Sequence, residues 1–131
     1  MVNKFSHPQL LHYVYPCIST WLLLDIIFFS IIPGPSLEDF SWMSLFKSDK
    51  VGHFLFYFAT CFFLTLSGIK IKTSIVYMGL LGVGLECVQW SMHNGRSFDV
   101  LDIFADLIGT FMILPVFYKT SVMKLFFFIQ H

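Results

Sequence analysis

Residues 99–118 have the sequence DVLDIFADLIGTFMILPVFY, in which three acidic residues lead into an apolar run. Asp99, Asp102 and Asp106 are spaced i, i+3 and i+7, which places them on one stripe of an α-helix. Residues 107–118 carry no charge. This combination predicts a membrane-spanning helix over about residues 103–118, with carboxylates at and just before its first turns.

The composition of the whole chain favours a membrane protein. Hydrophobic residues make up 56% of the 131 positions, and only 12% are charged. A soluble domain of this size would leave too much of this apolar surface exposed to water, so the excess is expected to face lipid. The 8 basic and 8 acidic residues balance, and no basic excess points to a nucleic-acid partner.

Four apolar runs predict one all-α, polytopic membrane domain over residues 1–131. They cover about residues 14–32, 51–67, 74–90 and 103–118. Backbone groups in lipid must be paired within a segment, so each run should be a helix. Pro33 and Pro35 end the first run, Gly68 ends the second, and the small residues Gly79, Gly82, Gly84 and Gly109 should permit close helix contacts.

The basic residues predict the direction of the four spans. One side collects five of them with no acidic residue: Lys4, Lys70, Lys72, Lys119 and Lys124. The other side has three basic residues among five acidic ones. The positive-inside rule then predicts that both termini are cytoplasmic.

With this topology, three helix ends and one turn bring polar residues to the same depth at the outer face. Asp49, Lys50 and His53 begin the second helix, and Glu86 and Gln89 end the third. Arg96 lies in the turn that leads to Asp99 and Asp102 at the start of the fourth. Because these residues come from separate segments, their convergence predicts a site.

Each of these residues also has a structural interpretation. Asp49 could cap the second helix, and Ser97 could cap the fourth while Asp99 complements its dipole. His53 could be a satisfied core histidine, and Arg96 could anchor at the interface. The whole set could also be a structural ion network. Asp25 and Asp106 lie deeper, have no obvious cationic partner at their depth in the sequence, and are expected to be protonated or paired across helices.

The residue types permit acid–base chemistry on an amphipathic substrate. His53 is the candidate acid or base, with Glu86, Asp99 and Asp102 binding a cation or orienting water. Asp49, Lys50, Gln89 and Arg96 are candidates for substrate binding, and a guanidinium suits an anionic, lipid-linked headgroup. Carboxylates and a histidine can bind a divalent cation, but the ligand spacing is not diagnostic, so the sequence leaves metal and cofactor undetermined.

Three segments resemble the VanZ-like family of small bacterial membrane proteins. They are DKVGHFLFY at residues 49–57, ECVQ at 86–89 and NGRSFDVLD at 94–102, followed by the small residues Ala105 and Gly109. The resemblance covers nearly half of the chain and implies a four-helix protein of the bacterial inner membrane. The family usually has asparagine where this chain has Asp106, and its second small residue in the fourth helix is not evident at Ile113.

The resemblance implies a role in the cell envelope without naming a reaction. The family is named for an accessory protein of glycopeptide resistance, linked to reduced susceptibility to teicoplanin. The leading hypothesis is modification of an envelope lipid or cell-wall precursor, and the alternative is a non-catalytic protein that binds a lipid or partner. A small ion or proton transporter, using Asp25 and Asp106, ranks last because no polar stripe clearly crosses the bundle.

Overall fold

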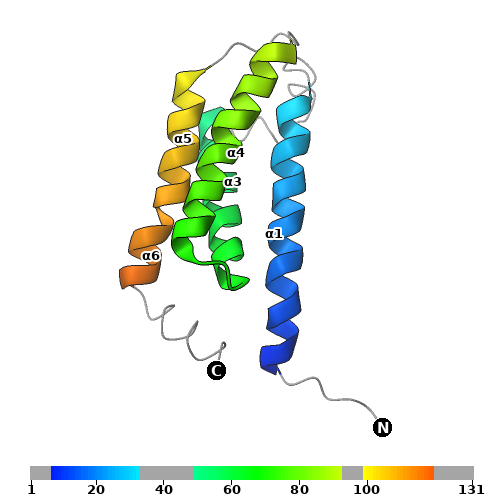
Figure 1. The fold of residues 1–131 in the computed structure, drawn as a ribbon, viewed down its shortest axis with the longest axis vertical. Helices are drawn as coiled ribbons and strands as arrows, with labels where there is room; N and C mark the ends of the chain where they lie inside the picture. Colours follow the sequence, from blue (N-terminus) through cyan, green and yellow to red (C-terminus); the bar gives the residue numbers. More distant parts are fainter. Residues whose placement is uncertain (1–6, 33–48, 93–98, 120–131) are drawn as a thin grey trace.

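The computed structural model describes residues 7–32, 49–92 and 99–119, and within these ranges the chain is all helical. Figure 1 shows the helices as a bundle of roughly aligned rods. Their bounds are α1 His7–Ile31, α3 Asp49–Leu66, α4 Ile71–Met92, α5 Val100–Phe111 and α6 Ile113–Lys119. The predicted all-α fold is therefore confirmed for the described residues.

Two boundaries differ from the prediction in ways that proline explains. The first helix begins at His7, well before residue 14, because Pro8 lies in the first turn, where its missing N–H has no helical partner to lose. The fourth helix divides into α5 and α6 at Met112. Pro115 has no N–H for the carbonyl of Phe111, and its ring would clash with that carbonyl in a continuous helix.

Three segments are long and apolar enough to cross a membrane: Tyr13–Ile31, Ile71–Met92 and Val100–Lys119. The last combines α5 and α6. The shorter α3 is apolar over Lys50–Leu66, and its 18 residues give a length of about 27 Å, just under the roughly 30 Å of a hydrocarbon core. The structure thus indicates a membrane protein with three candidate spans and one shorter apolar helix.

Alternating helix directions bring separate segments to one end of the bundle. α3 begins, α4 ends and α5 begins at the upper end in Figure 1, which we call the site end. α3 packs on α5, α4 and α1, while α4 also packs on α5. Gly68, with φ of 95°, ends α3 as predicted, since glycine adopts this left-handed conformation without strain.

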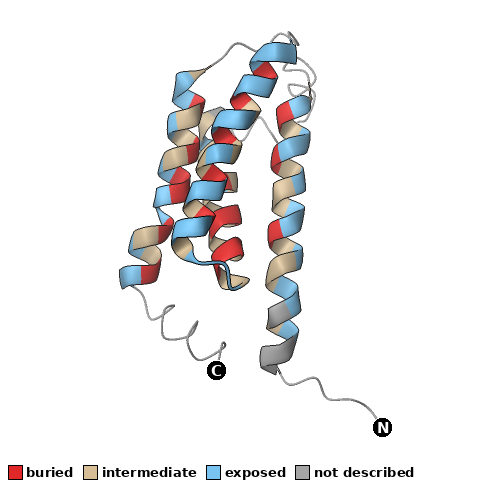
Figure 2. Ribbon diagram, viewed as in Figure 1, coloured by how far each residue is buried: buried red, intermediate tan, exposed pale blue. Residues whose placement is uncertain are grey.

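The interior of the bundle combines an apolar cluster with buried polar side chains, among them Glu86 and Asp106 toward the site end and Thr65 and Ser74 at the opposite end. The buried apolar residues are Ile26, Tyr57, Cys61, Leu64, Met78, Ile113 and Phe117. Large apolar side chains also cover the outward faces of the helices, which Figure 2 shows as pale blue; Trp21 is 70% exposed and Leu80 71%. Such a surface suits lipid rather than water.

Glycines set the closest helix contacts, as predicted for three of four positions. A Cβ at Gly109 of α5 would overlap the backbone carbonyl of Phe54 in α3. At Gly82 it would lie 2.9 Å from Oδ2 of Asp106, and at Gly79 it would lie 3.5 Å from Leu107. The prediction is wrong for Gly84, which is exposed and has no neighbouring atom within 4 Å of a Cβ, because it lies on the outward face of α4.

Candidate functional site

The start of α5 is held by its own sequence. Asp99 is the N-cap residue, with extended backbone, and its carboxylate accepts a hydrogen bond of 2.8 Å from the N–H of Leu101. This bond satisfies one of the N–H groups that have no partner inside the first turn of a helix. The sequence suggested Ser97 as the N-cap and a helix-dipole role for Asp99. In the structure the N-cap is Asp99, and Ser97 lies outside the described residues.

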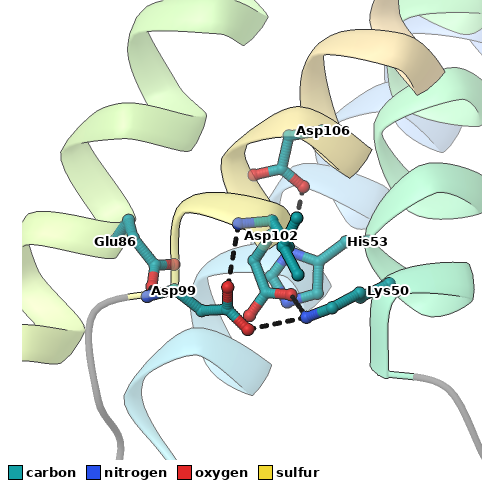
Figure 3. Close-up of polar contacts among 7 residues, drawn as sticks. Lys50, His53, Glu86, Asp99, Asp102 and Asp106 are labelled. Carbon is teal, nitrogen blue, oxygen red and sulfur yellow. Dashed lines mark hydrogen bonds and ion pairs between the residues drawn. The ribbon is translucent and has the colours of Figure 1, made fainter.

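Lys50 ties α3 to the first turn of α5. Its Nζ donates to Oδ2 of Asp99 at 2.7 Å and to Oδ1 of Asp102 at 2.8 Å (Figure 3). Both carboxylates thus share one ammonium group. The side chain of Asp102 is only 10% exposed, whereas those of Lys50 and Asp99 are each 38% exposed. The Lys50–Asp102 pair is therefore the better shielded of the two.

The hydrogen bond from Lys50 lowers the pKa of Asp99 below its ordinary value of 3.8, and the bond from the N–H of Leu101 lowers it further. Donors to a carboxylate stabilise its charged form. Asp99 is consequently an anion throughout the neutral range.

Glu86 adds a contact from α4. Its Oε1 accepts a hydrogen bond of 2.7 Å from the backbone N–H of Asp99, and Figure 3 shows the two groups meeting where α5 begins. Glu86 is 2% exposed, and Gln89, one turn nearer the site end, is 4% exposed. A buried carboxylate needs such donors, since burial without partners is costly. Glu86 therefore joins α4 to α5 at the same end as Lys50.

His53 and Asp106 form a second, deeper pair. Nδ1 of His53 lies 2.9 Å from Oδ1 of Asp106, with the two side chains 16% and 3% exposed. Tyr57 stacks on His53 and makes a further polar contact with Asp106. A neutral histidine that donates its Nδ1–H to a carboxylate keeps Nε2 as its basic nitrogen. This arrangement suits proton exchange.

The two pairs belong to one polar cluster, which we define as Lys50, His53, Glu86, Asp99, Asp102 and Asp106. Glu86 lies close enough to interact electrostatically with His53, Asp102 and Asp106. The cluster joins α3, α4 and α5, as the sequence predicts. Asp49 begins α3, but its side chain, together with Arg96, lies outside the described residues.

Asp106 is the residue whose place in the site the sequence analysis did not identify. The sequence led us to expect that Asp106 is protonated or paired across helices, and the structure pairs it with His53, because the first turns of α3 descend far enough for His53 to reach it. Its i+7 spacing from Asp99 was the signal that placed it on the same stripe. Asp25, by contrast, lies outside the cluster, and its Oδ1 accepts a 3.2 Å hydrogen bond from the indole of Trp21 in α1.

Comparisons with known proteins give no identification. No family model, no curated protein and no solved structure matches the chain. The inference of function therefore rests on the geometry of the polar cluster and on the sequence motifs.

Charge and geometry limit what the cluster can do. It contains four carboxyl groups against one lysine and one histidine, and the lysine is already shared by two of the acids. Among the described residues, no group of three His, Cys, Asp or Glu side chains is arranged to hold a metal ion. The arrangement suits a histidine–carboxylate acid–base pair beside an ion-paired lysine.

Proposed function

We propose that this chain is a VanZ-like integral membrane protein of the bacterial envelope that performs acid–base chemistry on an envelope lipid or a lipid-linked cell-wall precursor. The observation that carries the proposal is the His53–Asp106 pair, 2.9 Å between Nδ1 and Oδ1, inside an apolar helix bundle. His53 would take a proton from a hydroxyl or water of the substrate, and Asp106 would stabilise the imidazolium that forms.

The position of the cluster favours a substrate with a polar head and an apolar tail. The cluster lies at the ends of three helices whose outward faces are apolar. A lipid tail would contact those faces while its headgroup reached the cluster. Arg96, predicted in the adjoining turn, would supply the charge for an anionic headgroup, because Lys50 is already paired with Asp99 and Asp102.

The family and the location are part of the same proposal. The motif residues Lys50, His53, Glu86, Asp99 and Asp102 are the ones that converge in the cluster. We propose that α3 is a fourth span, that the cluster faces outward from the inner membrane, and that both termini are cytoplasmic. The first turn of α1 and the last turn of α6 lie at the same end of the bundle, opposite the cluster, as this topology requires (Figure 1). The family's link with teicoplanin susceptibility gives a phenotype to examine.

The topology predicts which segments an impermeant reagent can reach. In a variant with Cys17, Cys61 and Cys87 replaced by alanine, a cysteine placed at Ser36 should react with an impermeant maleimide on intact cells. A cysteine at Ser121 should react only after the cells are permeabilised. The opposite pattern would show that the protein is inverted, and labelling of both sites on intact cells would contradict an even number of spans.

The catalytic proposal predicts a product that depends on His53 and Asp106. Envelope lipids and cell-wall precursors would be profiled by mass spectrometry from cells that make the wild type, His53→Gln, Asp106→Asn or no protein. We expect a mass shift with the wild type that disappears in both variants, because neither amide can exchange protons at the pH of the cell. Asp25→Asn is the matched control, since Asp25 lies outside the cluster, and it should retain the shift.

Identical profiles with and without the protein, at matched membrane levels, would refute catalysis. The bridging of Asp99 and Asp102 by Lys50 supports the alternative function, in which the cluster is a recognition or structural site of a non-catalytic lipid-binding or partner-binding protein. A lipid that copurifies with the wild type and equally with Asp106→Asn would favour that alternative.

A further inference from the structure

Two buried hydroxyl groups differ from the other hydroxyls of the bundle. Among the described residues, five serine and threonine side chains donate to the carbonyl four residues earlier: Thr20, Ser30, Thr60, Thr65 and Ser67. Ser74 Oγ and Thr110 Oγ1 have no such bond, and both residues are 0% exposed. Burying a hydroxyl group without a hydrogen-bond partner destabilises a protein, so these two positions need another explanation.

Thr110 continues the acidic stripe of α5. It follows Asp106 by four residues and Asp99 by eleven, and three helical turns comprise about 11 residues, so all three lie on one face. Asp102, Asp106 and Thr110 are all buried on this face. The polar stripe therefore runs past the cluster and toward the opposite end of the bundle.

Ser74 extends the same line on α4. The buried positions of α4 are Ser74, Met78, Gly82, Glu86 and Gln89, which form one stripe. Gly82 contacts Asp106, and Gly79 contacts Leu107, so α4 and α5 run in opposite directions with these residues level. At about 1.5 Å per residue, Ser74 and Thr110 lie within about one helical turn of each other along the bundle. Ser74 is in the first turn of α4, at the end opposite the cluster.

Tyr57 of α3 lies one helical turn beyond His53, away from the site end. It is 3% exposed, stacks on His53 and contacts the position of a Cβ at Gly82, beside Asp106. Along the bundle axis, five buried or nearly buried polar groups therefore lie between the cluster and the first turn of α4. We call them the polar file: His53, Asp106, Tyr57, Thr110 and Ser74.

We propose that the polar file conducts protons between the cluster and the opposite end of the bundle. Hydroxyl groups both donate and accept hydrogen bonds, so Tyr57, Thr110 and Ser74 can pass a proton along, with water molecules bridging the intervals. This activity goes beyond lipid chemistry and does not depend on it. On the sequence, proton transport ranked last because no polar stripe clearly crossed the bundle. The polar file is our candidate for such a stripe.

The proton balance closes at the His53–Asp106 pair. A proton that binds Nε2 of neutral His53 makes an imidazolium, whose Nδ1 proton passes to Asp106. The neutral carboxyl group then gives its proton to the Thr110 side and becomes a carboxylate again. His53 is then left with its proton on Nε2, and it returns to its first tautomer when water molecules carry that proton to Nδ1. One proton therefore enters, one leaves and no charge accumulates on the pair.

The apolar residues around the file favour protons over larger ions. Met78, Ile113 and Phe117 are at most 1% exposed. Met78 follows Ser74 by four residues on the buried stripe of α4, and Ile113 follows Thr110 by three. A hydrated cation would have to lose its shell among these side chains, which supply no ligand. A proton needs only a chain of hydrogen bonds.

The test is proton flux into liposomes that contain the purified full-length chain. Liposomes loaded with K⁺ and a pH-sensitive dye receive valinomycin, and the K⁺ efflux drives protons inward. We expect acidification with the wild type above that of empty liposomes. Thr110→Val, Ser74→Ala and Asp106→Asn should each reduce the rate to that of empty liposomes.

Matched variants separate the proposal from a folding defect. Thr60→Val removes a buried hydroxyl that bonds to its own helix, and it should conduct like the wild type. Thr110→Ser keeps the hydroxyl and should also conduct. Flux in Thr110→Val and Ser74→Ala equal to that in Thr60→Val would refute the path, as would a wild-type rate equal to that of empty liposomes.

The test of proton flux and the test of lipid chemistry can give different outcomes. Ser74 and Thr110 do not belong to the cluster, so Ser74→Ala and Thr110→Val should keep the mass shift in envelope lipids while losing proton flux. If cells with the wild-type protein and cells without it showed the same lipid masses, the proposed catalysis would be refuted. The proton path would still be decided by the flux measurement.

Discussion

Gly109→Ala should prevent the chain from reaching its folded state in the membrane or leave it severely destabilised. A Cβ at this position would overlap the backbone carbonyl of Phe54, and a backbone group cannot move aside as the end of a side chain can. α3 and α5 would have to separate, which would weaken the Lys50 and His53 contacts between them. We expect a cost at or above the upper end of the roughly 1–3 kcal/mol typical of overpacking.

Thermal unfolding in detergent, followed by the loss of monodisperse protein, would measure this effect. Gly52→Ala and Gly84→Ala are the matched controls, because an added Cβ meets no atom within 4 Å at either position. Both should be neutral or slightly stabilising, since alanine is the better helix former by about 1 kcal/mol. A Gly109→Ala melting temperature equal to that of the controls would show that α3 and α5 pack less closely than described.

The sequence predicted the helices well because its signals were local. The signals were the apolar runs, Gly68 at the end of the second run, and Asp99 and Asp102 before the fourth. Each can be read from neighbouring residues without knowledge of the tertiary structure. The division at Met112 was missed although Pro115 was visible, because an apolar run alone says nothing about a break within it. The early start at His7 was missed because apolar length was taken as the limit of the helix.

The site was predicted less completely because it depends on helix register. Alternating helix directions were enough to bring Lys50, Glu86 and Asp102 to one end. The pairing of His53 with Asp106 required the axial offset between α3 and α5, which the contact at Gly109 sets and which no local pattern encodes. The same offset leaves Lys50 level with Asp102, so one close contact determines both layers of the cluster.

Charge balance within the cluster depends most on Lys50. Lys50→Met should destabilise the protein, because it leaves Asp102, which is 10% exposed, without its cation. An unpaired buried group of this kind costs roughly 1–3 kcal/mol, and the exposure of Lys50 itself places the expected value in the lower half of that range. Unfolding in detergent at pH 7 would measure it. Lys72→Met, at an exposed position of α4, is the control and should have little effect.

Removing the unpaired carboxylate of Asp102 should restore part of the stability that Lys50→Met loses. In Lys50→Met/Asp102→Asn the buried carboxylate is gone, so the double variant should be more stable than Lys50→Met alone.

The sign of the pH dependence of stability follows from Asp99. The hydrogen bond from Lys50 lowers the folded-state pKa of Asp99 below the ordinary value of 3.8. The stability that this bond adds is therefore complete above pH 3.8 and is lost as the pH falls through the lower, folded-state pKa. The stability difference between the wild type and Lys50→Met should therefore narrow in acid. A difference that stays constant from pH 7 to pH 3, or a double variant no more stable than the single one, would mean that Lys50 acts through packing of its aliphatic stem rather than through its charge.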